Sequence, residues 1–175
     1  QYCASGSQDR TVVVRRLDTL RPSAVLAGHR RAVWDAVFFG SDKKKLASSS
    51  SDKTIKIWSI KSGTCLFTLD GHEATVLAVR AVGRQLVSAA ADGVLKIWTP
   101  ETRSCDCTVA ADSVDDASKI WALAIREEDP FLLLAADADG RLETFVDATR
   151  DDDLEAKVQR DHVIAQEQTL RDALK

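Results

Sequence analysis

Two sets of residues in this chain carry the side-chain types of a serine-hydrolase triad. Each contains one His, one Ser and one Asp in the same order, namely His29, Ser48 and Asp52 in the first set and His72, Ser88 and Asp92 in the second. In a hydrolase the His takes the proton of the Ser nucleophile, and the Asp orients the His. No Gly-x-Ser-x-Gly nucleophile elbow surrounds either Ser. Because a triad depends on exposed geometry and not on residue types alone, we expect both sets to be structural and the protein not to be an enzyme.

The cysteines do not follow a metal-binding pattern. Cys105 and Cys107 are separated by one residue, and no second pair or His cluster completes four ligands. On an alternating strand these two side chains share a face, and we expect both to be buried. The sequence also lacks a phosphate-binding P-loop and a Gly-x-Gly-x-x-Gly pattern. It therefore predicts no catalytic residue, no metal and no cofactor.

Charge limits the classes of partner. The chain has 24 Lys and Arg against 27 Asp and Glu, which excludes a strongly basic domain that coats nucleic acid. Eight of the acids and five of the bases lie in residues 147–175, so residues 1–146 carry no net charge. The only basic run, Lys43 to Lys45, suits a solvated loop that blunts a sheet edge or, alternatively, a phosphate contact. No apolar run is long enough to span a membrane, and the absence of Met leads us to expect a longer parent chain.

The sequence repeats itself at intervals of 40 to 47 residues. Gly28-His29 matches Gly71-His72, and residues 51–58 match residues 91–98, with weaker copies around Asp9 and Asp139. In each copy an Asp stands six residues before an aromatic position, which Arg15 occupies in the first copy. This period fits a unit of four short strands better than a two-helix repeat.

One unit shows the strands that must position these residues. Apolar or alternating segments at residues 32–39, 46–50, 54–60 and 65–69 are separated by turn residues. The Asp-Gly dipeptides at residues 92–93 and 139–140 favour tight hairpin turns. A single four-stranded sheet cannot bury both faces, whereas sheets arranged radially around an axis can.

These repeats resemble the WD-repeat family of β-propellers. The resemblance covers residues 1–146 and rests on the two Gly-His pairs, on Asp52 and Asp92, and on the Ile-Trp pairs at 57–58 and 97–98. It implies an all-β fold, a partial WD-repeat β-propeller of about three and a half blades, followed by a C-terminal α-helix. The chain begins at a second strand and the last unit lacks a fourth, so we expect most of the ring to lie upstream. Residues 1–146 would be the C-terminal part of the propeller, and residues 147–175 an acidic helical tail leading toward a helical assembly domain.

The resemblance also implies a structural hydrogen-bond ring that joins the His, Ser and Asp of each blade to a Trp. The ring residues would be His29, Ser48, Asp52 and Trp58, then His72, Ser88, Asp92 and Trp98, and only Asp139 in the last unit. Both Trp-containing rings are expected to be complete. A bond between His29 and Asp52 would place the connection between blades and the turn after the second strand on one rim. Either rim could bind protein, with Arg30 and Arg31 on one and Lys43, Lys44 and Lys45 on the other.

The acidic segment at residues 147–175 narrows the resemblance to one group within the WD-repeat family. Leu154, Val158, Leu170 and Leu174 form an interrupted apolar stripe that suits packing on a partner. Two regular units, a degenerate last unit and an acidic segment make the chain similar to the C-terminal propellers of the transducin-β-like, U-three small-nucleolar-RNA-associated proteins in the UTP-B complex of the small-subunit processome.

That resemblance implies a non-catalytic interaction scaffold in the nucleus and nucleolus, acting in small-subunit processome assembly and 18S pre-rRNA processing. Its partners would be other WD-repeat proteins of a multi-subunit complex, with local contacts to pre-rRNA or U-three small nucleolar RNA. No membrane and no small-molecule substrate are expected. The alternative is a substrate receptor of a ubiquitin ligase or a signalling adaptor, which would need a peptide-binding rim.

Overall fold

The computed structural model describes residues 1–40, 44–110, 119–126, 132–138, 140 and 142–146. These residues form strands and turns and contain no helix. The first two sheets contain β1 (Tyr2–Gly6), β2 (Thr11–Arg16), β3 (Pro22–Ala27), β4 (Val33–Phe39), β5 (Lys45–Ser50), β6 (Ile55–Ser59) and β7 (Thr64–Leu69). The other two contain β8 (Val76–Val82), β9 (Gln85–Ala90), β10 (Val94–Thr99), β11 (Ser104–Ala110), β12 (Ile120–Arg126), β13 (Leu132–Asp137) and β14 (Leu142–Val146). The helix predicted within residues 147–175 lies outside the described residues.

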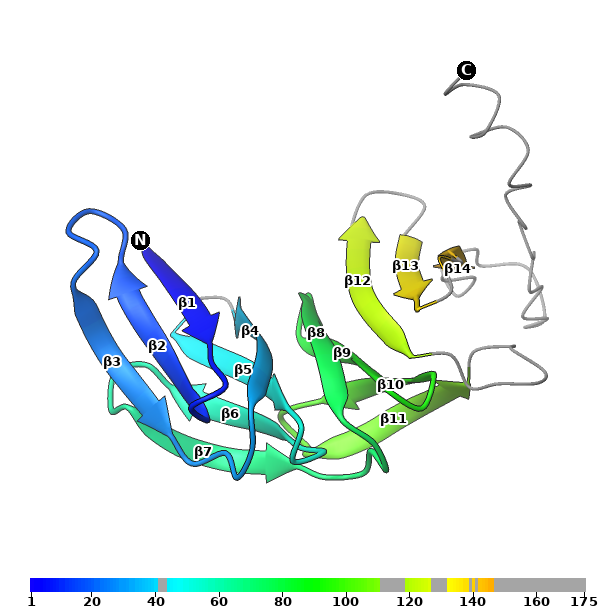
Figure 1. The fold of residues 1–175 in the computed structure, drawn as a ribbon, viewed down its shortest axis with the longest axis horizontal. Coiled ribbons are helices and arrows are strands. Elements are labelled where there is room, and N and C mark those ends of the chain that lie inside the picture. Colours follow the sequence, from blue (N-terminus) through cyan, green and yellow to red (C-terminus); the bar gives the residue numbers. More distant parts are fainter. Residues whose placement is uncertain (41–43, 111–118, 127–131, 139, 141, 147–175) are drawn as a thin grey trace, which may run out of the picture.

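Consecutive strands pair antiparallel to form four separate sheets. Their orders are β1-β2-β3, β4-β5-β6-β7, β8-β9-β10-β11 and β12-β13-β14. The sheets lie side by side in an arc, with β4, β8 and β12 toward its inside and β7 and β11 toward its outside (Figure 1). The all-β partial propeller is thus confirmed, with two four-stranded blades between two three-stranded sheets.

Hydrophobic side chains fill the spaces between neighbouring sheets. Ile55 and Ile57 of β6 pack with Val79 of β8, whereas Trp58, the next residue on β6, packs with Val12 and other residues of the first sheet. A further cluster around Ile120 and Leu133 joins the third sheet to the fourth. Alternation along a strand therefore buries both faces of the second sheet, as a radial arrangement requires.

A bulge interrupts each inner strand near its start. Trp34 of β4 is the extra residue between partners Val33 and Asp35, and Leu77 and Trp121 occupy the same place in β8 and β12. A bulge bends the strand and redirects the side chain of the extra residue. The result at Trp34 and Trp121 is two large apolar side chains that are about half exposed, at 50% and 49%.

A second bulge overturns the expectation for the cysteines. The outer strand β11 pairs Cys105 with Trp98 but Cys107 with Ile97, so Asp106 is the extra residue. Trp98 and Ile97 are neighbours on β10 and point to opposite faces, and their partners therefore do so too. The two cysteines do not share a face, and both are exposed rather than buried.

Candidate functional site

The structure brings the four residues of the first predicted ring together. The Nδ1 atom of His29 lies 2.9 Å from Oδ2 of Asp52, and Nε2 lies 2.7 Å from Oγ of Ser48. The indole N–H of Trp58 donates to the same Ser48 oxygen at 2.8 Å. The ring therefore connects β5 and β6 to the connection that precedes β4, and it ties the blade together at one rim.

Glycine precedes the His in this arrangement because the Trp ring lies against the backbone there. A Cβ atom on Gly28 would lie 3.1 Å from the Cη2 atom of Trp58, and one on Gly71 would lie 3.2 Å from the same atom of Trp98. These distances are tighter than ordinary van der Waals contact. The Gly-His dipeptide thus reflects close packing of backbone and indole.

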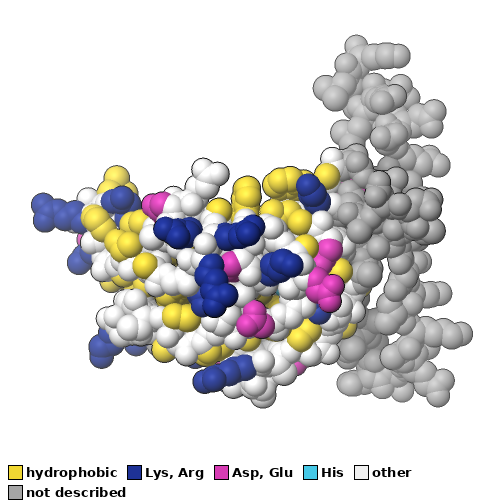
Figure 2. All heavy atoms as spheres, turned by 60° about the horizontal axis from the view of Figure 1, so that its bottom comes forward, with side chains coloured by type: hydrophobic (Ala, Val, Ile, Leu, Met, Phe, Trp, Pro, Cys, Tyr) yellow, Lys and Arg dark blue, Asp and Glu magenta, His cyan; other side chains and the backbone are white. Residues whose placement is uncertain are grey.

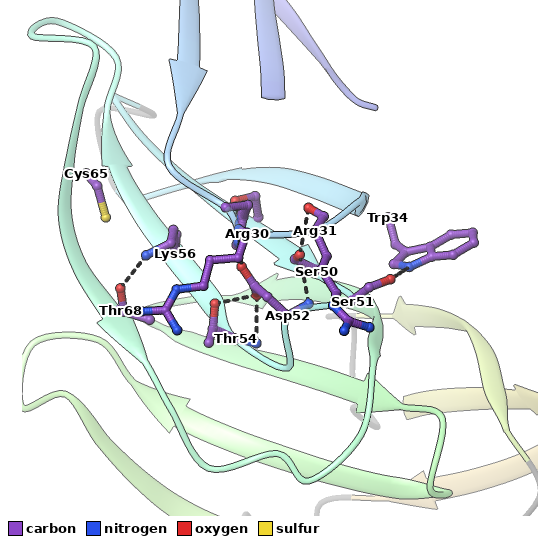
Figure 3. A network of polar contacts seen from close by, with 12 residues as sticks. Arg30, Arg31, Trp34, Ser50, Ser51, Asp52, Thr54, Lys56, Cys65 and Thr68 are labelled. Atoms are coloured by element: carbon purple, nitrogen blue, oxygen red, sulfur yellow. Dashed lines mark hydrogen bonds and ion pairs between the residues drawn. The ribbon is translucent and has the colours of Figure 1, made fainter. Parts of the chain in front are cut away.

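Donors around Asp52 hold its carboxylate in place. Its Oδ2 accepts the backbone N–H of Arg30 at 2.8 Å, and its Oδ1 accepts the backbone N–H and the hydroxyl of Thr54 at 3.1 and 2.7 Å (Figure 3). Burial alone would raise the pKa of Asp52, but the hydrogen bonds from Arg30, Thr54 and His29 outweigh it and lower that pKa to about 2. The carboxylate is therefore charged at neutral pH.

His29 is the neutral partner in the first ring. Burial lowers the pKa of its imidazole, although the hydrogen bond and the charge of Asp52 oppose the shift. A neutral ring that donates from Nδ1 to Asp52 must accept at Nε2. The Ser48 hydroxyl consequently donates to His29 and accepts from Trp58.

The second ring lacks one link. Nε2 of His72 lies 2.7 Å from Oγ of Ser88, and the indole N–H of Trp98 donates to that oxygen at 2.8 Å. The Nδ1 atom of His72, however, is buried without a hydrogen-bond partner among the described residues. The expected complete ring is therefore wrong for this blade.

Two residue differences near the Asp accompany the missing link: Val94 replaces Thr54, and Ala90 replaces Ser50, whose hydroxyl accepts the backbone N–H of Asp52. Asp92 accepts the backbone N–H of Val94 at 3.1 Å, but Val94 has no hydroxyl to match that of Thr54. The Asp92 carboxylate makes no hydrogen bond to Nδ1 of His72. Burial lowers the pKa of His72 to about 4, with Lys96 acting in the same direction and Asp92 opposing it.

This geometry argues against catalysis at either set. Ser48 and Ser88 are fully buried, and His29 and His72 are each 6% exposed. Each Ser oxygen also accepts the indole N–H of a Trp, and its burial keeps it away from a substrate carbonyl. Among the described residues, no group of three or more His, Cys, Asp and Glu side chains could hold a metal ion.

The other predicted site residues lie apart from the rings. Arg30 and Arg31 are exposed on the connection that carries His29, whereas Lys44 and Lys45 lie at the turn that enters β5. Figure 3 shows Arg30 and Arg31 extending on either side of Asp52. Predictions that lie outside the described residues are those for Lys43, Asp139, Leu154, Val158, Leu170 and Leu174.

Sequence reasoning missed two features on the inner strands. The rings of Trp34 and Trp121 meet edge to face, with centroids 6.2 Å apart. In addition, Arg80 of β8 binds the carboxylate of Asp35 on β4 and donates to the carbonyl of Leu123 on β12 at 3.0 Å. The sequence did contain a sign of the Trp pair. Trp34 and Trp121 each stand five residues after the position of the ring His, which Asp116 occupies in the last unit.

No helix in the described part of the chain has the length and hydropathy needed to cross a bilayer.

Comparison with known proteins gives a family match for the two middle units. The family described as "WD domain, G-beta repeat" matches residues 20–59 and 63–99. Coatomer subunit beta'-2 of Arabidopsis thaliana is 38% identical over 77 residues, which are 43% of this chain and 8% of that protein. Pre-mRNA-processing factor 19 of Mus musculus is 35% identical over 85 residues, covering 47% of this chain and 17% of its own length. Protein Notchless of Drosophila melanogaster is 36% identical over 66 residues, or 35% of this chain and 14% of that protein.

The matched segment is thus a small part of each relative. Their names range from a coatomer subunit to a pre-mRNA-processing factor, so similarity in the repeats alone fixes no single task.

Proposed function

Because residues 20–59 and 63–99 are WD repeats, within a partial WD-repeat propeller, we propose that the protein is a non-catalytic scaffold that binds other proteins. One observation carries this proposal: the matched His, Ser and Trp residues of both blades form hydrogen bonds with one another inside the blades. The two Ser-His pairs are buried and bonded to indole N–H groups, so they stabilise the sheets. The exposed loops and rims are what remains for function.

Within this class, we propose a subunit of the UTP-B complex that acts in the nucleolus during small-subunit processome assembly. Support comes from the order of the sequence, in which two regular units precede a degenerate unit and an acidic segment. Residues 1–146 would be the propeller part, and residues 147–175 would lead into an assembly domain that contacts paralogous WD-repeat proteins. Contacts with pre-rRNA or U-three small nucleolar RNA would be local, since residues 1–146 carry no net charge.

Truncation tests this assignment. Removing residue 151 and all residues after it from the tagged full-length protein should abolish co-purification of the other WD-repeat subunits, as measured by mass spectrometry. Leu20→Ala is the matched control, because this side chain is 63% exposed on a turn of the first sheet and should leave recovery unchanged. Unchanged recovery after the truncation would contradict the assignment to this complex.

The same purification discriminates the alternative function. A substrate receptor or signalling adaptor would bring down ubiquitin-ligase or signalling subunits through its propeller rim, with or without the tail. Such an outcome would keep the scaffold and replace the nucleolar role.

A further inference from the structure

The exposed aromatic pair on the inner strands has no part in either hydrogen-bond ring. Resting on the scaffold function proposed above, we propose that Trp34 and Trp121 anchor an acidic segment of a partner protein that carries an aromatic or aliphatic side chain. The site lies where β4 and β12 begin, on either side of β8.

Bulges place both Trp side chains at this position. Trp34 and Trp121 are the extra residues of β4 and β12, and Leu77 is the extra residue of β8, which contacts both strands. Leu77 is buried at 7% exposure, whereas the two Trp side chains are half exposed and meet at an interplanar angle of 80°. Most large apolar side chains on these blades are buried, so an exposed Trp pair is a candidate binding surface.

Hydrogen bonds hold the surface around Trp34 in place before any ligand arrives. The indole N–H of Trp34 donates to Oγ of Ser51 at 2.6 Å. Ser50 donates to the carbonyl of Arg31 at 3.2 Å and accepts the backbone N–H of Asp52 at 3.1 Å. In Figure 3 the Trp34 side chain points toward Ser51, and Arg31 lies beside the same turn. A preorganised aromatic loses little conformational entropy on binding.

The charges beside the pair favour an acidic ligand. Arg31 stands three residues before Trp34, Lys119 stands two residues before Trp121, and both are exposed. Lys53 is exposed on the turn that follows Ser51 and Asp52. The Asp52 carboxylate is already bonded to His29, Arg30 and Thr54 and is turned into the blade.

A methylated lysine would be a poorer ligand for this surface. Aromatic pairs attract cations through their faces, but Arg31 and Lys119 repel a second positive charge. Glu73, one residue after His72 on the equivalent connection before β8, is exposed and works against the proposal, whereas Asp35, next to Trp34, is already paired with Arg80. Carboxylates on the ligand would instead pair with the guanidinium of Arg31.

Single-stranded nucleic acid also combines an anionic backbone with groups that stack on aromatics. Two observations favour a peptide. The edge-to-face pair presents two nearly perpendicular rings rather than parallel platforms for successive bases. The chain as a whole also offers little to a phosphate backbone, because residues 1–146 carry no net charge and Lys and Arg side chains on the face seen in Figure 2 form separate groups with Asp and Glu among them.

The test selects ligands without assuming their sequence. A phage-displayed library of random twelve-residue peptides is panned against the full-length protein, and the enriched peptides are measured by fluorescence anisotropy. We expect peptides with several Asp or Glu residues around one aromatic or aliphatic residue. Trp34→Ala, Trp121→Ala and Arg31→Glu should each weaken their binding by about tenfold or more, while Leu20→Ala should not.

Several results would overturn the proposal. These are no enrichment, enrichment of basic peptides, equal binding by Trp34→Ala and the unmodified protein, or tighter binding of an oligouridylate than of any selected peptide. If Trp34→Ala fails to fold by circular dichroism, Trp34→Leu keeps apolar contact and should still lose affinity because the ring and its bond to Ser51 are gone. If the unmodified protein enriches no acidic peptide but co-purifies the other WD-repeat subunits in a tail-dependent way, this site alone is refuted. If acidic peptides bind at the Trp pair but the truncation leaves co-purification unchanged, only the UTP-B assignment is refuted.

Discussion

The Ser48 hydroxyl lies between an imidazole and an indole N–H, and this buried position suits a structural role in the blade better than a catalytic one. The second blade has fewer donors around the equivalent Asp. Thr54 helps to orient Asp52 toward His29, whereas Val94 offers only its backbone N–H, and Nδ1 of His72 remains without a partner. A buried polar atom in this state costs about 1–3 kcal/mol.

His72 should make the stability of the protein depend on pH. In the unfolded chain this imidazole binds a proton below a pH of about 6.5, but burial delays protonation in the folded protein until about pH 4. Stability from the neutral form is therefore present above pH 6.5 and is lost as the pH falls toward 4. We expect the free energy of unfolding to drop by about 2 kcal/mol between pH 7 and pH 5 because of this group.

Urea denaturation of the unmodified protein and of His72→Gln at both pH values checks this. The variant should be less stable at pH 7 but should lose less stability on acidification, because His29 is then the one remaining buried imidazole with a lowered pKa among the described residues. Asp52 supplies a built-in reference, because its lowered pKa affects stability only as the pH falls from about 3.8 toward 2. Equal pH dependence in the two proteins would show that His72 is not the titrating group.

At the scale of elements, each blade repeats the same turn between its second and third strands. The residue after the Asp has a positive φ of 74° at Arg10, 71° at Lys53, 73° at Gly93 and 80° at Gly140. Asp-Gly at two of these turns made the conformation predictable. At Lys53 the same backbone carries a side chain, and a left-handed conformation costs a non-glycine residue roughly 1–2 kcal/mol.

Lys53→Gly should therefore stabilise the second sheet, by about 1 kcal/mol after the entropy of a more flexible unfolded chain is deducted. The measurement is the free energy of unfolding in guanidinium chloride. Gly93→Ala is the matched reverse variant and should destabilise by a similar amount. A loss of stability in Lys53→Gly would mean that the lysine side chain contributes more than the backbone strain costs.

Within the described residues, the sheets are joined by apolar clusters and by polar contacts of the inner strands. Arg80 binds the Asp35 carboxylate of the preceding blade and the Leu123 carbonyl of the following one, and Asp35 also accepts the backbone N–H of Val79 at 3.1 Å. Three neighbouring blades thus share one guanidinium. Both charged side chains are partly buried, at 36% and 24% exposure, so screening by solvent is incomplete.

Arg80→Met should lower the free energy of unfolding by about 2 kcal/mol, because it leaves the Asp35 carboxylate with one fewer donor while keeping most of the apolar stem. A double-mutant cycle with Asp35→Ala measures their coupling, which we expect to exceed about 0.5 kcal/mol. Arg16→Met is the control, since Arg16 pairs with Asp18 on the exposed surface and its replacement should cost much less stability. Equal losses at Arg80 and Arg16 would argue against a link between blades.

Periodicity and turn residues predicted the sheets well, because they act locally. The segment expected at residues 32–39 is β4 at Val33–Phe39, and the three strands that follow it agree within one residue at each end. Bulges could not be foreseen, because an extra residue depends on how two strands pair and not on either strand alone. The bulge in β11 places Cys107 on the opposite face from Cys105, against the expectation, and the bulge in β4 leaves Trp34 exposed. The missing hydrogen bond at Nδ1 of His72 likewise depends on the three-dimensional surroundings of Asp92.

Two exposed cysteines can carry spin labels that report the distance between neighbouring blades. Cys65 of β7 and Cys105 of β11 stand at matching positions on the outer strands of adjacent sheets, and both thiols are exposed. With Cys3 and Cys107 replaced by Ser, nitroxide labels on this pair would form a molecular ruler between the outer edges of the two blades. Electron–electron distance distributions recorded with and without a bound partner would then report whether the arc opens, closes or stays rigid during assembly.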